Sequence, residues 1–516
     1  MTATMCRGQY MTILRGVYVL RGFGGRNTRC AQVKGVPEPL PVYEVLGPGA
    51  LRTRLQLAAH RGLARFVGRE TEMAHLNQTL EATRAGRGLD AMHHLGAALG
   101  LLDRLPDTPA RASRELMLLL SLGPALMDVR GYGAPEVGAT YTRARQLCEQ
   151  LGETSQLFAA LLGLRIHNVS RAQYAVGREL GERMLHMAQQ AQNADWLLEA
   201  HGALGACMFP QGELGAAAAH LKQALALYDP ERHQAHVFAH GVDPGIRALN
   251  FLALILWLQG YPDQARERSM DALALAQKLA YGPTLAFTLA YAAELHQLRR
   301  EAPLVRERAE AAIAVSIEHG LPYWLAWGTI FSGWARVQPG NLQDGIAQLR
   351  EGLRAEQSAG GAEQRSYFLA TLADCLWRAG DVEGGLRTLE EATAIVNKTG
   401  EHFFDAELHR LKGVMLLASV SEAERVIASS DEAQACFLRA IAVARAQGAR
   451  ALQLRAATNL ARLWQRAGRL GEARQVLSEV FDTFTEGLDT GDLRDARALL
   501  DALPSSSART IDDVRG

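Results

Sequence analysis

The chain contains LALILWLQG at residues 252–260, and three further stretches that end in a short turn follow it at a constant spacing. These three are LAYAAELHQLRR (289–300), IFSGWARVQPG (330–340) and LADCLWRAG (372–380). The four turn residues are Gly260, Arg300, Gly340 and Gly380, so the period is 40 residues. A fixed period of this size predicts an array of structural units of one kind, each stacked on its neighbours.

Small side chains recur at three positions of every unit. Seven residues before the turn stand Ala253, Ala293, Gly333 and Ala373. Five residues after it stand Ala265, Val305, Gly345 and Gly385, and seven further on stand Ala272, Ala312, Gly352 and Ala392. Small residues let two helix backbones approach closely, and positions seven apart share one helical face. The spacing therefore predicts two helices that pack across a tight turn.

A fourth column closes each unit with Ala280, Gly320, Gly360 and Gly400. Glycine just past a helix C-terminus adopts the left-handed conformation at low cost and ends the helix. Each unit is thus predicted to be a helix, a tight turn, a longer helix and a stop.

This pattern resembles the tetratricopeptide repeat, whose usual period is about 34 residues. The resemblance covers roughly residues 88–502, with insertions near 229–243 and 419–431. It implies an all-α fold, a solenoid of helical hairpins wound as a right-handed superhelix of about twenty helices, with the concave face as the recognition surface.

The N-terminal part has a different character. KGVPEPLPVYEVLG (34–47) holds a short predicted strand, Pro41–Leu46, and FVGRE (66–70) precedes an amphipathic helix near 72–84. These segments resemble the tail of a bacterial class III adenylate or guanylate cyclase domain and the start of the signalling ATPase module that follows it in fusion proteins. The C-terminal phrases AELHRLKG (406–413) and LARLWQRAG (460–468) are similar to the helical-repeat region of the same proteins.

The chain departs from that family where its chemistry would lie. A phosphate loop needs glycines that let backbone N–H groups hold phosphate and a lysine that reaches the outer oxygens. This chain contains no Gly-Lys dipeptide, and the sequence before residue 34 leaves no room for the paired aspartates of a cyclase core. We therefore expect no enzymatic activity and no cofactor.

Four regions follow from these observations. Residues 1–30 are expected to be a disordered extension, or a product of a start codon placed too early. Residues 31–87 are expected to be the irregular or β remnant of the cyclase tail, linker and ATPase start, residues 88–502 the repeats, and residues 503–516 a disordered tail.

Composition excludes several classes of partner. Fifty-five basic and 55 acidic residues give a formal net charge of zero, which argues against a general attraction to nucleic acid or anionic lipid. No stretch is apolar for the roughly 18 residues that a membrane span needs. The six cysteines show no zinc-ligand spacing, so thiols in a reducing cytoplasm are the expectation.

A histidine cluster in the first insertion is the one candidate binding site. His233, His236 and His240 lie at i, i+3 and i+7, which places three imidazoles on one face of a helix, and Asp243 follows them. The alternatives are a metal site, a contact patch for a ligand or partner, and solvated or packing histidines. No catalytic metal motif accompanies the cluster, so no metal is assigned to it.

The functional hypothesis is a non-catalytic scaffold in bacterial signal transduction, which binds protein partners or a small ligand. An alternative is a regulatory arm that acts in trans with separate cyclase or ATPase modules. A third is a deleted gene product without a function of its own. The oligomeric state and the identity of the partner are not indicated by the sequence.

Overall fold

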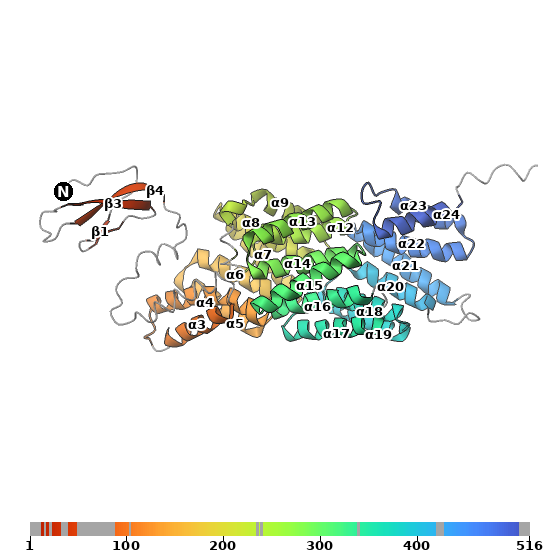
Figure 1. Ribbon diagram of the computed structural model, residues 1–516, viewed down its shortest axis with the longest axis horizontal. Coiled ribbons are helices and arrows are strands. Elements are labelled where there is room, and N and C mark those ends of the chain that lie inside the picture. Colours follow the sequence, from red (N-terminus) through yellow and green to blue (C-terminus); the bar gives the residue numbers. More distant parts are fainter. Residues whose placement is uncertain are drawn as a thin grey trace, which may run out of the picture. The chain divides into compact units, whose positions relative to one another are not determined.

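A computed structural model describes the backbone of four strands before residue 50, and then residues 88–102, 105–233, 237, 241–337, 341–418 and 428–504. The chain divides into two units, Met1–Gln78 and Thr79–Gly516. Figure 1 shows the strands of the first unit and the helices of the second. FVGRE and the predicted helix after it, together with residues 505–516, lie outside the described residues.

The N-terminal unit contains two antiparallel strand pairs. Strand β1 (Thr12–Leu14) pairs with β2 (Val17–Val19), and β3 (Phe23–Ala31) pairs with β4 (Leu40–Pro48). The predicted strand Pro41–Leu46 is confirmed within β4. Strand β3 takes its backbone partners from β4, which its own glycine-containing sequence, FGGRNTRCA, does not indicate. The extension expected for residues 1–30 and the remnant expected for residues 31–87 stay predictions.

The second unit is all helical in its described residues. Its helices are α3 (Gly88–Leu102), α4 (Pro109–Arg130), α5 (Pro135–Leu151), α6 (Thr154–Ser170), α7 (Tyr174–Gln190), α8 (Ala194–Met208), α9 (Leu214–Leu227), α10 (Pro230–His233), α12 (Pro244–Leu258), α13 (Pro262–Leu279), α14 (Gly282–Leu298), α15 (Ala302–His319), α16 (Pro322–Val337), α17 (Leu342–Ser358), α18 (Arg365–Arg378), α19 (Val382–Thr399), α20 (Asp405–Ala418), α21 (Ala428–Gln447), α22 (Arg450–Arg466), α23 (Leu470–Phe481) and α24 (Gly491–Ala502). Consecutive helices pack as antiparallel hairpins, as the repeat predicts. None of these helices is both long and apolar enough to cross a bilayer.

The predicted turns and stops are confirmed by backbone conformation. The turn residues Gly260, Arg300 and Gly380 have φ of 89°, 64° and 86°, while Gly340 lies outside the described residues. The stop residues Ala280, Gly320, Gly360 and Gly400 have φ between 52° and 75°. The helices before these described residues therefore end at or next to a left-handed residue, where the chain turns back.

The small columns lie at helix–helix contacts, and α16 and α17 approach each other through glycines. A Cβ added at Gly333 would lie 2.7 Å from the backbone N of Leu349 and 2.8 Å from the carbonyl O of Gly345. No ordinary side chain fits there without moving a backbone. The small residues thus set the distance between the two helices of a hairpin.

The first helix of each central hairpin is buried over most of its surface. We call α12, α14, α16 and α18 the inner helices and α13, α15, α17 and α19 the outer helices. Every residue of α12 is buried, whereas α13 buries a single stripe that includes Ala265, Ala272 and Ala276. Such a stripe is typical of an amphipathic surface helix, and burial all round is typical of a helix at the centre of a core.

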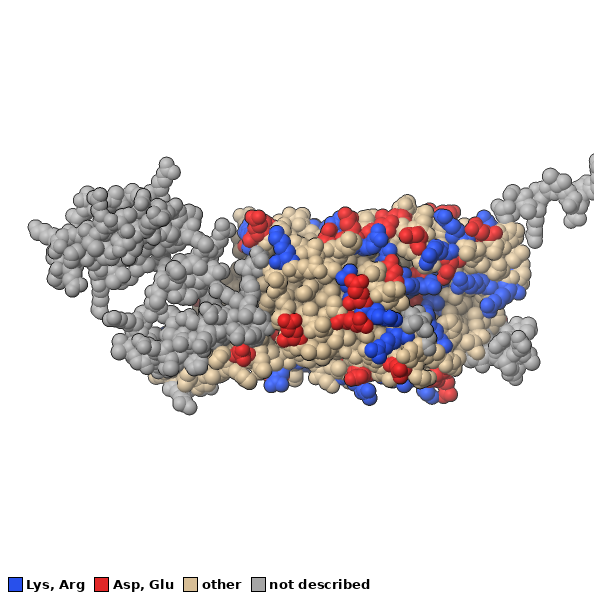
Figure 2. Space-filling model, in the orientation of Figure 1, with Lys and Arg blue, Asp and Glu red and all other residues tan. Residues whose placement is uncertain are grey.

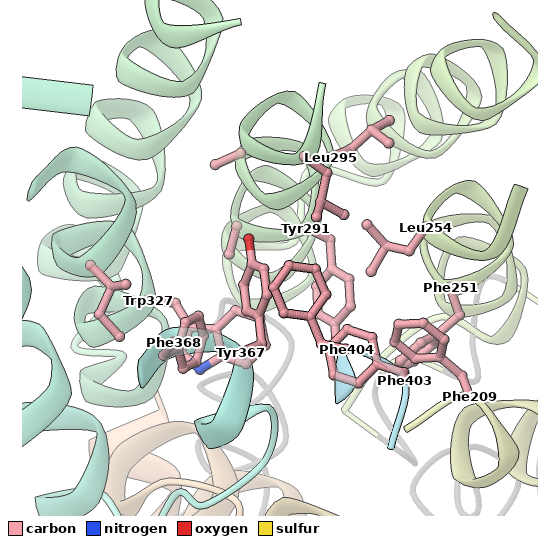
Figure 3. Close-up of a cluster of buried hydrophobic side chains, with 14 of the residues drawn as sticks. Phe209, Phe251, Leu254, Tyr291, Leu295, Trp327, Tyr367, Phe368, Phe403 and Phe404 are labelled. Atoms are coloured by element: carbon pink, nitrogen blue, oxygen red, sulfur yellow. The ribbon is translucent and has the colours of Figure 1, made fainter. Parts of the chain in front are cut away.

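Aromatic side chains fill the space between the inner helices (Figure 3). Ring centroids lie 5.1 Å apart for Phe251 and Tyr291, 5.4 Å for Tyr291 and Trp327, and 4.9 Å for Trp327 and Phe368. Phe403 continues the series through Phe209, and the centroids of these two rings lie 4.8 Å apart. We call this series the aromatic column. In this part of the array it occupies the inner surface that the repeat pattern predicts as a recognition face.

Residues one superhelical turn apart also touch. The amide of Ala362 donates to the carbonyl O of Ser170 at 2.8 Å, and the amide of Phe403 donates to that of Pro210 at 3.1 Å. The Tyr174 hydroxyl donates to Glu401 at 2.6 Å across 227 residues of sequence. The superhelix is therefore wound tightly enough that successive turns are hydrogen-bonded to each other.

We expect Gly333→Ala to lower the free energy of unfolding by about 1–3 kcal/mol, because a new methyl group would collide with the backbone of α17. Gly96→Ala is the matched control, since Gly96 lies within α3 and a Cβ there meets nothing within 4 Å. It should stabilise by about 0.5–1 kcal/mol through helix propensity. Equal effects of the two substitutions in urea unfolding would contradict this account.

A buried carboxyl group ties α4 to the later repeats. Asp128 is 7% exposed and accepts a hydrogen bond from the Tyr281 hydroxyl at 3.2 Å. Burial raises the pKa of Asp128 to about 7, although the bond from Tyr281 opposes the shift. The folded state therefore retains the carboxyl proton of Asp128 at pH values where the unfolded chain has lost it.

This difference makes stability depend on pH. The stabilising contribution of protonated Asp128 is present below pH 4 and is lost as the pH rises towards 7. Asp128→Asn keeps a hydrogen-bond acceptor without the charge. The free energy of unfolding of this variant should therefore exceed that of the wild type by an amount that grows between pH 4 and 8, to about 2–4 kcal/mol. Urea unfolding of both proteins at pH 4 and pH 8 measures this difference. A difference that does not change with pH would refute the raised pKa of Asp128.

Candidate partner-binding groove

A groove with a volume of about 250 Å³ lies where the aromatic column ends, against the inner side of the last repeats. We call it the C-terminal groove. It is lined by Gln297, Arg300, Trp334, Ala370, Thr371, Asp374, Trp377, Arg378, Phe404, Glu407, Arg410, Leu411, Val414, Arg455, Thr458, Asn459, Arg462, Asp492 and Asp495. Most of these come from the first helices of successive hairpins, α14, α16, α18, α20 and α22, and from α24. The 40-residue period therefore brings residues from distant parts of the sequence to one surface.

Apolar side chains form the floor of the groove. Trp334 and Phe404 are each 4% exposed, and Leu411 is also buried. Trp377 and Val414 are half-buried and lie nearer the surface. The groove thus combines a fixed aromatic base with apolar groups that a partner can still cover.

Arginine–carboxylate pairs occupy the middle of the groove. Arg410 donates to both oxygens of Glu407, from Nε and Nη2, at 2.8 Å each. Arg455 donates from Nε to Asp492 at 2.8 Å and contacts Glu407 at 3.4 Å. Two-point pairing of this kind fixes the orientation of both groups.

Arg455 also joins the end of the array to its centre. Its Nη2 donates to the carbonyl O of Leu298 at 2.5 Å, and its guanidinium lies 4.9 Å from the centre of the Trp257 ring. Arg300 donates to Asp492 at 3.0 Å and to Asp495 at 2.8 Å. The charged network therefore holds α24 and α22 against α12 and α14.

The electrostatic effects on these groups agree with the geometry. Burial acts to raise the pKa of Glu407, but the neighbouring Arg410 and Arg455 outweigh burial and hold that pKa below its ordinary value. Asp492 and Glu407 likewise raise the pKa of Arg455 against the effect of its burial. Both groups are charged at neutral pH, so the network is ionic.

Arg462 differs from the other arginines of the groove. Arg462 is exposed, and its side chain forms no ion pair or hydrogen bond with any residue in the described part of the chain. Across the face drawn in Figure 2, basic and acidic side chains are interspersed. Arg462 is therefore a cation that a partner's carboxylate can approach.

The predicted histidine cluster is only partly described. His233 is 1% exposed, with Nδ1 against the backbone of Asp229 and Nε2 3.1 Å from Asp195. Asp243 is 1% exposed, caps α12 by accepting from the Ile246 amide, and accepts from the Tyr228 hydroxyl. His236 and His240 lie outside the described residues.

These contacts give His233 and Asp243 structural roles. Within the described ranges, no three His, Cys, Asp or Glu residues are grouped as a metal site would require. The contact patch formed by His233, His236, His240 and Asp243 stays a prediction.

Sequence reasoning missed the residues of the groove. A sequence feature that indicates the groove is present in AELHRLKG (406–413). There Glu407 and Arg410 interrupt a helix whose other inner positions are apolar. A charged pair at i, i+3 on a buried face needs partners from another helix. Only the fold shows that Arg455, 48 residues later, is that partner.

A sequence model of the tetratricopeptide repeat matches residues 246–268, 366–391 and 454–479. These ranges fall on three of the hairpins, α12–α13, α18–α19 and α22–α23. The helical array contains tetratricopeptide repeats.

A curated protein of Rhizobium meliloti (strain 1021), described as "Uncharacterized protein R02095", is 26% identical over 389 residues. The match covers 73% of this chain and 36% of that protein, so the chain spans about a third of the length of its relative.

Solved structures with a similar arrangement of helices include a Rap protein complexed with competence and sporulation factor, which is 12% identical with a TM-score of 0.43. That match covers 67% of this chain and 98% of the Rap chain. Another is the signal transduction ATPase with a tetratricopeptide repeat sensor, PH0952 from Pyrococcus horikoshii, 14% identical with a TM-score of 0.38. That match covers 76% of this chain and 54% of the PH0952 chain.

Arg455→Met should destabilise the protein by about 3–5 kcal/mol, because it leaves Glu407 buried with one of its cations removed. Arg462→Met is the matched control in the same groove and should change stability by less than about 0.5 kcal/mol. Denaturant unfolding of both variants measures the difference. If Arg455→Met left the stability of the protein unchanged, the ionic network would not be what holds α22 and α24 in place.

Proposed function

We propose that this chain is a non-catalytic scaffold that holds a segment of a partner protein in the C-terminal groove. The observation that carries the proposal is the exposed Arg462 beside an apolar floor, in a groove built by successive repeats. The groove is large enough for several side chains, and its free cation favours a segment that carries both acidic and apolar residues.

We further propose a role in bacterial signal transduction in the cytoplasm, in a protein related to the cyclase–ATPase fusions. The resemblance at residues 34–47, 66–70 and 406–413 supports this origin, and the sequence has no Gly-Lys pair for a phosphate loop. A regulatory arm acting in trans with separate cyclase or ATPase modules is the second candidate. The same resemblance supports it.

Site-specific crosslinking in the native cell tests the groove directly. A photoreactive amino acid at Trp377, in the groove, is compared with one at Met270, which is 64% exposed on the outer helix α13. We expect a discrete adduct from position 377 that is lost in an Arg462→Glu background, and none from position 270. Adducts from position 270 alone, or adducts unaffected by Arg462→Glu, would contradict the proposal.

A further inference from the structure

A second cavity, separate from the C-terminal groove, lies between the inner side of α6 and the helices α12, α14 and α16. Its volume is about 60 Å³. Phe251, Phe287, Tyr291 and Trp324 form aromatic walls, and the charged groups that line it are Arg165, Arg247 and Glu363. Two guanidinium groups in a small aromatic cavity are unusual, because arginine is rarely buried without a paired anion.

Arg165 is the buried guanidinium without a hydrogen-bonded partner among the described residues. It lies on α6 and is 3% exposed. Among the residues that the structure describes, none forms an ion pair or a hydrogen bond with Arg165, and its Nε is fully enclosed. A guanidinium presents five N–H donors, so this side chain leaves its hydrogen-bonding capacity directed at the cavity.

Arg247 contributes further donors. Its Nη2 donates to Glu199 at 2.5 Å, but Nε and Nη1 meet no acceptor among the described residues. Gly202 makes room for it, since a Cβ there would lie 3.2 Å from Nη2. One edge of Arg247 is thus held by protein, while Nε and Nη1 are enclosed without an acceptor from the described part of the chain.

The formal charges around the cavity balance, with one carboxyl group for each guanidinium. Glu199 neutralises Arg247, which leaves Glu363 opposite Arg165. Burial raises the pKa of Glu363 to about 7, and the same desolvation lowers the pKa of Arg165. Close to neutral pH, Glu363 is therefore protonated in part of the molecules, and a single bound negative charge would complete the balance.

We propose that this cavity is a binding site for a small monocarboxylate, with the carboxylate on Arg165 and Arg247 and the short carbon chain against the aromatic walls. Size limits the ligand, because a cavity of about 150 Å³ is needed for benzene. The occupant is a carboxylate of about two to four carbon atoms. This site is independent of the proposed role of the C-terminal groove.

Calorimetry and thermal unfolding of the wild-type protein give the first test, in a buffer that contains no carboxylate. Acetate, propionate and butyrate are titrated at constant ionic strength, with acetamide as the uncharged isostere of acetate and inorganic phosphate as a strongly hydrated anion. We expect saturable binding and a rise in Tm with at least one carboxylate, and neither with acetamide. No saturable carboxylate binding, or equal binding of acetamide, would overturn the proposal.

Arg165→Met gives the second test, with Arg387→Met as the control, since Arg387 is 67% exposed on α19. Removing a buried charge that makes no hydrogen bond with the described residues should leave Tm of the ligand-free protein at or above that of the wild type, while carboxylate affinity falls at least tenfold. Arg387→Met should leave affinity unchanged. Carboxylate binding retained by folded Arg165→Met would overturn the assignment, and if this variant does not fold, the wild-type ligand series decides.

Discussion

The close approach of helix backbones at glycine and alanine is the constraint on which the rest of this structure depends. Where Gly333 faces Gly345, the two helices of a hairpin touch through main-chain atoms. Repeated at the other small positions, this contact keeps each hairpin thin. A thin unit stacked many times produces a tightly wound superhelix, and tight winding brings residues such as Tyr174 and Glu401 into contact across 227 positions of sequence.

Tight winding then decides where binding can occur. In the centre of the array the aromatic column fills the inner surface, so α12 is buried along its whole length. An inner surface that is packed in this way is a core, and it leaves a cavity of only about 60 Å³ around Arg165. Towards α24 the inner surface becomes polar, and Arg410, Glu407 and Arg455 line an open groove instead. One helical array thus provides a small aromatic cavity and a larger polar groove.

Much of the fold could be predicted from the sequence, because the repeat is a local signal. The turn residues Gly260 and Gly380 and the stop residues Gly320 and Gly400 adopt the left-handed conformations that the spacing indicates. The burial of the inner helices could not be predicted in the same way. It results from contacts one superhelical turn apart, such as Phe403 on Pro210, and no periodicity reports them.

The sites were harder to predict than the fold for the same reason. The spacing of His233, His236 and His240 suggested a surface patch, but spacing does not say which side of a helix is covered, and His233 is buried against Asp195. The groove and the cavity are assembled from single charged residues on different repeats. Arg165 and Arg247 are 82 positions apart in sequence, and each one alone looks like an ordinary surface arginine.

The central claim is that the surrounding helices close off α12 and α14 over almost their whole length. Backbone hydrogen exchange measured by mass spectrometry tests it most directly. The account predicts that amides of α12 and α14 exchange far more slowly than those of the outer helices α13 and α15, because of these four helices only α12 and α14 are buried over almost their whole length. Equal exchange in the two sets would contradict it.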